Sequence, residues 1–243
     1  MKKNIFILIL ALFSFSAIHA EGDTNVKALP LSLTDNDSYA NVSQIDGVDV
    51  SYTRNFTNVN WQAIYLPFSF TYEDVKDDFE LAYINAVHQN DIDGDGEIDE
   101  TLIEVIKIKS GSTVPNKPYL IRAKTTGVKT ISVENATVYA AEEESVDCST
   151  TIAKFTFTGN YSTVSYETMS KNKYYTMVGG EQDYTLVGGQ LGFIGDDSGL
   201  KPFRWYMKAE SRNSRYNTSN AARAITVSVI DEEATGISQS RRQ

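Results

Sequence analysis

Short segments in which apolar and polar residues alternate limit the folds open to this chain more than any other feature. Ile64, Leu66 and Phe68 are each separated by one residue. A period of two places such side chains on one face of an extended strand, because successive side chains in a strand point to opposite sides. Helical spacing is confined to two brief stretches, 72–79 and 166–171. The pattern therefore predicts an all-β chain with one or two short helices.

Turn sequences rich in Gly and Asn, such as Thr158-Gly159-Asn160, separate the expected strands. The strands are expected at 29–33, 61–70, 102–108, 119–123, 128–133, 153–157, 174–178, 184–187, 203–207 and 225–229. Pro67 cannot donate a ladder hydrogen bond, so strand 61–70 is expected at a sheet edge or with a bulge. Many short strands divided by turns predict a single β-sandwich, for which a jelly-roll-like topology is one form. The predicted core consists of Ile64, Leu66, Phe68, Phe155, Phe157, Ile225, Val227 and Val229.

The N-terminus has the pattern of a secretory signal peptide. Two lysines precede the apolar run Ile5–Ile18, which ends shortly before Ala20. A basic start, an apolar run that is short for a membrane span of ~20 residues, and a small residue at the cleavage point are typical of such signals. We therefore predict a signal peptide at 1–20 and an exported protein, either periplasmic, at the cell surface or extracellular. No later segment is apolar enough to span a membrane after processing.

The remaining chain is expected to form one domain. Residues 21–45 are polar and contain one expected strand, and residues 46–231 are predicted to form the β-sandwich. No internal repeat and no Pro- or Ser-rich linker divides this stretch. Residues 232–243 show no apolar periodicity, which is typical of a disordered tail.

Charge and residue counts exclude several classes of function. The formal net charge is -10 at pH 7, which disfavours nucleic-acid binding because such binding depends on neutralising phosphates with Lys and Arg. Cys148 is the single cysteine, so an internal disulfide is impossible. His88 is the single histidine after Ala20, and no Gly-x-Ser-x-Gly motif accompanies it. We therefore predict a protein that is not an enzyme. A glycosidase, which needs only two carboxylates, remains an alternative.

The acidic segment 91–99 is a candidate calcium loop. Its candidate ligands are Asp91, Asp93, Asp95, Glu97 and Asp99. Carboxylates at alternate positions converge on one Ca²⁺ ion when a glycine, here Gly96, permits a tight turn. Leu102 occupies the position of the bidentate Glu of an EF-hand, and the flanks are expected to be strands, so an EF-hand is not predicted. A shortened Ca²⁺ loop and a metal-free acidic turn are both kept as interpretations, since turns favour Asp and Gly.

Strand 203–207 provides a candidate ligand face. Alternation places Arg204 and Tyr206 on one side of the strand and Trp205 on the other. Sugar-binding sandwiches use exposed aromatic platforms, so Trp205, Arg204 and Tyr206 are candidate ligand residues. The alternative is that these aromatic side chains pack in the core, as aromatic residues in strands commonly do.

Several stretches resemble the non-repeat region of leucine-rich-repeat surface proteins of Bacteroidota, the BspA-like group. They are Tyr52–Phe56, Asn60–Phe68, Pro118–Lys124 and Lys201–Met207, and Glu233–Ile237 is similar to the linker before a C-terminal sorting module in that group. The resemblance implies an exported or cell-surface location and roles in adhesion or host interaction. The chain itself has no leucine-rich repeat, and no catalytic or ligand residue carries over from the group.

Together these observations predict a secreted or cell-surface, non-enzymatic β-sandwich module that binds a protein or glycan partner. The first alternative is a structural accessory domain stabilised by Ca²⁺ at segment 91–99. The second alternative is a glycan-processing enzyme.

Overall fold

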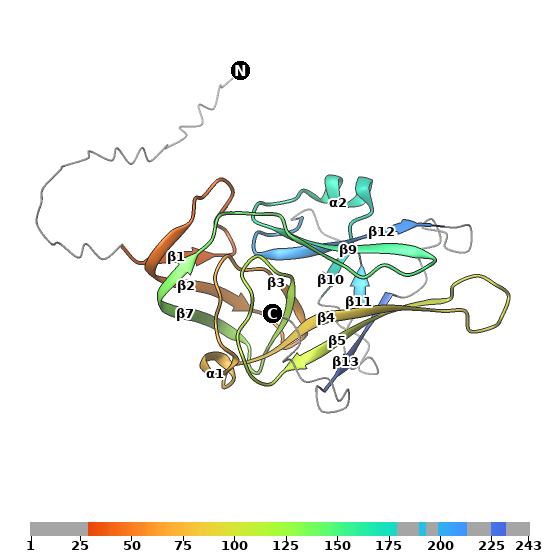
Figure 1. Ribbon diagram of the computed structural model, residues 1–243, viewed down its shortest axis with the longest axis horizontal. Coiled ribbons are helices and arrows are strands. Elements are labelled where there is room, and N and C mark those ends of the chain that lie inside the picture. The colour runs from red at the N-terminus through yellow and green to blue at the C-terminus, as the bar shows by residue number, and fades with distance from the viewer. Residues whose placement is uncertain (1–28, 179–189, 193–198, 213–224, 232–243) are drawn as a thin grey trace, which may run out of the picture.

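The computed structural model describes residues 29–178, 190–192, 199–212 and 225–231 (Figure 1). The predicted signal peptide at 1–20, the strand expected at 184–187 and the predicted tail at 232–243 lie outside the described residues. The fold class is confirmed: the chain is an all-β sandwich of packed sheets, with two short helices in its described part.

The strands form three sheets. The N-terminal sheet has the order β1-β2-β7, with β1 (Leu31–Thr34), β2 (Ile45–Phe56) and β7 (Gly127–Val138). The central sheet has the order β10-β11-β13-β5-β4-β6-β3, with β10 (Thr176–Val178), β11 (Gln190–Gly192), β13 (Ile225–Ile230), β5 (Glu100–Ile108), β4 (Phe79–Asn90), β6 (Tyr119–Ala123) and β3 (Gln62–Ile64). The distal sheet has the order β12-β9-β8, with β12 (Arg204–Ser211), β9 (Ala153–Asn160) and β8 (Ser145–Asp147). Only the β1–β2 and β5–β13 pairs are parallel among the described ladders.

Both helices are brief and capped by hydroxyl side chains. Thr71 precedes α1 (Tyr72–Val75), and Ser165 precedes α2 (Tyr166–Asn172). Each hydroxyl accepts a hydrogen bond from a backbone N–H three residues later, which satisfies a donor that the helix leaves free. The expected helices therefore occur where the spacing predicted them, although the first ends earlier. Neither helix is long and apolar enough to cross a membrane.

The stretch 61–70 shows where strand prediction succeeded and where it failed. Only β3 is a strand, and it lies at the edge of the central sheet, as Pro67 predicted. The following residues are buried without joining a ladder. Tyr65 donates its N–H to the carbonyl of Phe203, and the carbonyl of Pro67 accepts from Tyr139. The apolar alternation therefore predicted correctly which residues are buried, but the strand is shorter than it predicted.

The polar N-terminal segment is part of the sandwich. Leu31 is paired with Val50 in the parallel ladder between β1 and β2. Tyr39 is 2% exposed, and its N–H donates to the carbonyl of Tyr161. The segment 29–44 is thus held by the sheet and by the region after β9.

Two hydrophobic cores lie on opposite faces of the central sheet. The first core packs the N-terminal sheet, including Tyr52, against one face. The second core packs the distal sheet, including Phe155 and Phe157, against the other face. Neighbouring residues of β6 pack into different cores: Ile121 belongs to the first core and Leu120 to the second. A strand that is buried on both sides carries a continuous apolar run, as β6 does.

The predicted core residues divide between these two cores. Ile64, Leu66 and Phe68 belong to the first core, whereas Phe155, Phe157, Ile225 and Val227 belong to the second, and Val229 is half-buried against it. The expectation of one shared interior is corrected to two, because the central sheet buries both of its faces.

Candidate functional site

A cluster of buried and half-buried charged and polar side chains, which we call the joint, connects the three sheets. It consists of Asp35, Tyr52, Arg54 and Arg204. Asp35 follows β1, the next two residues lie on β2, and Arg204 begins β12. Arg54 is only 2% exposed. Because a buried charge is costly unless it is paired and hydrogen-bonded, its partners explain why it is tolerated there.

The carboxylate of Asp35 is shared by two guanidinium groups. Arg204 makes a bidentate contact, with Nη1 2.9 Å from Oδ1 and Nη2 2.7 Å from Oδ2. Arg54 Nε lies 3.4 Å from Oδ1. Bidentate arginine–carboxylate pairs are stronger and more directional than single hydrogen bonds. Among the described residues of the joint, two positive groups therefore share one negative group.

The hydroxyl of Tyr52 completes the joint. It donates to Asp35 and accepts from Arg54 Nε at 2.9 Å and from Arg204 Nη1 at 3.0 Å. Burial is the main cause that raises the pKa of Tyr52 well above its ordinary value. The phenol therefore stays protonated and keeps the proton that it donates.

Arg54 also ties two strands to each other. Its Nη1 and Nη2 donate to the carbonyl of Ala63 in β3 at 3.2 and 3.3 Å. Its Nη2 donates to the carbonyl of Phe203, just before β12, at 3.4 Å. Phe203 has a φ of 60°, which is unusual for a bulky side chain. The guanidinium thus connects the edge of the central sheet to the start of the distal sheet.

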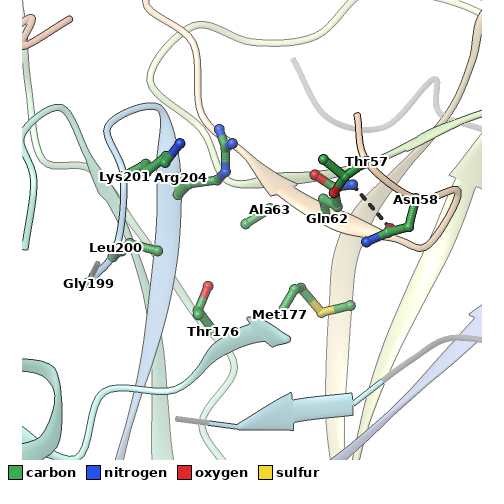
Figure 2. Close-up of a pocket in the computed structure, with 10 residues that line it drawn as sticks. All are labelled: Thr57, Asn58, Gln62, Ala63, Thr176, Met177, Gly199, Leu200, Lys201 and Arg204. Carbon is green, nitrogen blue, oxygen red and sulfur yellow. Dashed lines mark hydrogen bonds between the residues drawn. The ribbon is translucent and has the colours of Figure 1, made fainter. Parts of the chain in front are cut away.

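A pocket of about 300 Å³ lies beside the joint, and we call it the joint pocket. It is lined by Thr57, Asn58, Gln62, Ala63, Thr176, Met177, Gly199, Leu200, Lys201 and Arg204. Figure 2 shows Lys201 and Arg204 on the side opposite Thr57, Asn58 and Gln62. Ala63, whose carbonyl accepts from Arg54, lies between these two sides in Figure 2.

The wall that carries Lys201 is fixed by its backbone. Leu200 and Val164 form a bridge with hydrogen bonds in both directions. Gly199 has a φ of 68°, and a Cβ there would lie 2.2 Å from the carbonyl oxygen of Val164. The side-chain amide of Asn160 donates to the carbonyl of Lys201 at 3.2 Å. Only glycine fits at the start of this wall, and the backbone of Lys201 is held in place.

The opposite wall presents amide groups. Asn58 Oδ1 accepts from the N–H of Asn60 at 3.0 Å and from Gln62 Nε2 at 3.4 Å. These bonds orient both amides and leave Asn58 Nδ2 and Gln62 Oε1 for other partners. Among the described residues, neither of these atoms has a hydrogen-bond partner, and the same holds for the Thr57 hydroxyl and Lys201 Nζ. Four polar groups with unused hydrogen-bonding capacity therefore surround the joint pocket.

The candidate ligand face on β12 is divided by the structure as the alternation predicted. Trp205 is 1% exposed, and its indole N–H donates to the carbonyl of Tyr119. It packs in the second core and offers no surface to a ligand, so of the two interpretations core packing applies to it. Arg204 faces the joint, and Tyr206 stacks on Tyr174 with ring centroids 4.2 Å apart. Arg204 is thus the candidate that also lines the joint pocket.

The candidate calcium loop forms the tip of the β4–β5 hairpin, which extends away from the body of the molecule (Figure 1). Asp91, Asp93 and Asp99 each place one carboxylate oxygen within 4.8 Å of the others. Asp95 and Glu97 are outside this group. The carboxylates also accept backbone N–H groups of the same loop: Asp91 accepts from residues 94 and 96, and Asp99 from residue 92. The loop therefore already has hydrogen bonds that close the turn.

The histidine and the cysteine lie in ordinary surroundings. His88 Nε2 is 3.3 Å from a carboxylate oxygen of Glu104 on the neighbouring strand. Cys148 is half-buried against the second core, and burial raises the pKa of its thiol to about 11. A thiol with such a pKa is protonated at neutral pH and is a poor nucleophile.

Sequence reasoning missed the joint and most of the joint pocket. Asp35, Arg54 and Arg204 are far apart in the sequence and carry no local motif. One signal was present in β2, where Val48, Val50, Tyr52, Arg54 and Phe56 occupy the buried positions of one alternating series. An arginine in the apolar phase of a strand indicates a buried charge that needs a partner.

Comparisons with known proteins gave no further information: no protein-family model matches the chain, and no curated protein and no solved structure matches it.

Proposed function

We propose that this chain is an exported, non-enzymatic β-sandwich module that binds a glycan in the joint pocket. The observation that carries the proposal is the set of four polar groups around this pocket that have no hydrogen-bond partner for these atoms within the described part of the chain. Ligand sites are concave and have a few convergent polar groups that fix the orientation of the ligand. The location outside the cytoplasm rests on the predicted signal peptide.

The size of the joint pocket favours a glycan over a folded protein as its ligand. Its volume of about 300 Å³ is at the lower end of the ~300–1,000 Å³ that is typical of small-molecule sites. A stable protein interface instead buries ~800 Å² on each partner. Sugar hydroxyls both donate and accept hydrogen bonds, which suits a lining that mixes an amide donor, an amide acceptor and a hydroxyl.

The chemistry of the lining favours binding over glycan hydrolysis. Glycosidases use a pair of carboxylates that flank the scissile bond. The polar side chains described around the joint pocket are amides, hydroxyls and cations. Such groups supply hydrogen bonds and positive charge, which serve affinity.

A glycan array tests this function. We expect the mature protein to bind a subset of the glycans, and the double variant Asn58→Ala, Gln62→Ala to lose that binding. Gln44→Ala is the matched control, because it removes an exposed amide outside the joint pocket. Binding that survives the double variant, or an array without any bound glycan, would refute the proposal. Release of shortened sugars from bound glycans would favour the glycan-processing alternative.

A second candidate function concerns the hairpin tip, where three carboxylate oxygens lie within 4.8 Å of one another. We propose as an alternative that Ca²⁺ binds Asp91, Asp93 and Asp99 and stabilises the module. A ligand that binds only the folded state raises the melting temperature by mass action. Thermal melts in CaCl₂ and in EGTA test this idea: a shift that Asp93→Asn abolishes supports it, and identical melts dismiss it.

A further inference from the structure

We propose that the glycan bound in the joint pocket carries a carboxylate, as a uronic acid residue does. This inference rests on the proposed function and adds the charge of the ligand to it. Its basis is the excess of positive over negative side chains among the described residues at this position, in a chain that is acidic overall.

The positive charge comes from two sources. In the joint, the guanidinium groups of Arg54 and Arg204 share the single carboxylate of Asp35. Lys201 adds an ammonium group on the same wall of the pocket as Arg204 (Figure 2). The whole chain has a formal net charge of -10 at pH 7. A positively charged pocket in such a chain attracts anions and distinguishes this site from the rest of the surface.

Lys201 is the residue that would contact the carboxylate. Its backbone is held between the bridge at Leu200 and the amide of Asn160. Its side chain is exposed and, within the part of the chain that the structure describes, makes no ion pair. The guanidinium of Arg204, by contrast, is engaged by Asp35 through both terminal nitrogens. Arg204 therefore contributes positive electrostatic potential and positions the wall, while the ammonium group of Lys201 is available to contact the ligand.

The opposite wall indicates that the anion belongs to a sugar rather than to a phosphate alone. Gln62 Oε1 is a hydrogen-bond acceptor and Asn58 Nδ2 is a donor, and a sugar ring offers several hydroxyl groups that can pair with both, whereas inorganic phosphate at neutral pH carries only one or two O–H groups. A uronic acid supplies ring hydroxyls for Gln62 and Asn58 and a carboxylate for Lys201. The carboxylate and the hydroxyls belong to the same sugar ring, so a small pocket can contact both.

Isothermal titration calorimetry with matched probes tests the inference. The probes are a glucuronic acid trisaccharide, the glucose trisaccharide of the same linkage, an acidic tripeptide and inorganic phosphate. We expect the acidic sugar to bind about tenfold or more tightly than the neutral sugar, as a charge-assisted hydrogen bond provides. We also expect this advantage to shrink at high salt, because exposed charges are screened.

Two lysine variants test whether Lys201 causes the preference for the acidic sugar. Lys201→Gln should remove the advantage of the acidic sugar, so that the acidic and the neutral sugar bind this variant with equal affinity. Lys171→Gln, an exposed lysine of α2 outside the joint pocket, should behave like the parent protein. Urea melts of both variants should match that of the parent, because neither side chain is buried.

The outcomes separate this inference from the function on which it rests. Equal affinity for both sugars would overturn the inference and leave a neutral-glycan module. Tighter binding of the tripeptide or of phosphate would also overturn it, since the anion would then not be a sugar carboxylate. Absence of binding by either sugar would overturn the proposed function together with the inference.

Discussion

The joint and the hairpin tip both gather charged side chains, but they differ in sign, burial and origin. The joint places opposite charges in the interior, with Arg54 2% exposed and Asp35 between two guanidinium groups. The tip places like charges at the end of an extended hairpin. Its three clustered carboxylates accept hydrogen bonds from backbone N–H groups that lie at most seven residues away. The joint can therefore fix the arrangement of the sheets, whereas these hydrogen bonds of the tip close its own turn.

Sequence separation explains why only one of these regions could be predicted. The acidic loop is a contiguous pattern, and its turn-forming residues follow one another. The joint unites residues that precede β2, lie on β2 and begin β12, so it exists only after the sheets are assembled. Function that depends on such a cluster is invisible to a search for local motifs.

The largest expected effect is the loss of the buried guanidinium in the joint. Arg54→Met should lower the free energy of unfolding by about 3–5 kcal/mol, because it leaves Asp35 and two backbone carbonyls with fewer partners in the interior. Urea denaturation measures the change. Lys76→Ala, which breaks an exposed ion pair with Glu73, is the control and should cost less than about 1 kcal/mol. A similar small cost for both variants would remove the distinction between buried and exposed charges.

Two glycines with positive φ, one beside the joint pocket and one at the tip, differ in how closely they are packed. Gly199→Ala at the joint pocket should cost about 2–3 kcal/mol, because left-handed backbone strain adds to the clash with the carbonyl of Val164. Gly94→Ala at the tip should cost about 1 kcal/mol, because a Cβ there has no atom within 4 Å and only the strain remains. Equal losses in urea denaturation would contradict the close packing assigned to the wall of the pocket.

Alkaline pH should weaken the body of the fold. Burial raises the pKa of Tyr39 and of Tyr206 to about 12, whereas tyrosines of the unfolded chain ionise near ~10. The unfolded state therefore loses these protons first, so the stability from these residues is intact below about pH 10 and is lost as pH rises toward about 12. Urea midpoints measured across this range should fall, and Tyr206→Phe should make the fall less steep. A flat profile would contradict the burial of these phenols.

The smallest effect is expected at the tip. Asp93→Asn in EGTA should change the free energy of unfolding by less than about 0.5 kcal/mol, as exposed substitutions usually do. Asparagine keeps the oxygen that accepts from the N–H of Asp95. Thermal or urea melts check this expectation, and a loss of more than about 1 kcal/mol would show that the tip supports the fold.

The sequence predicted those parts of the fold in which one face of a strand is apolar and the other polar. β9 and β13 follow this rule, and both were expected. β4 was expected only as a strand of unspecified length before the acidic segment, because the consecutive residues Leu81 and Ala82 are buried on opposite faces and a register shift between Ile84 and Ala86 breaks its period. β2 was missed because Arg54 interrupts its apolar series. β4 is packed against another layer on both of its faces, and β2 contains a buried charge. Local alternation of apolar and polar residues does not predict either situation.

The candidate site was predicted only in part. Arg204 was selected as a ligand residue for its place on a strand beside aromatic side chains, and the structure places it at the joint pocket instead of on an aromatic platform. Lys201, Asn58 and Gln62 had no distinguishing pattern. Their proximity follows from the bonds of Arg54 to Ala63 and to Phe203, which connect two sheets.

The position at which an acidic sugar contacts the protein shows whether the joint pocket is the ligand site. In a nuclear magnetic resonance titration with the glucuronic acid trisaccharide, we expect the side-chain amide signals of Asn58 and Gln62 and the backbone signal of Lys201 to shift with a common saturation curve. The signals of the hairpin tip should stay in place. Shifts confined to the tip or to the Tyr174–Tyr206 pair would contradict the assignment of the joint pocket as the ligand site.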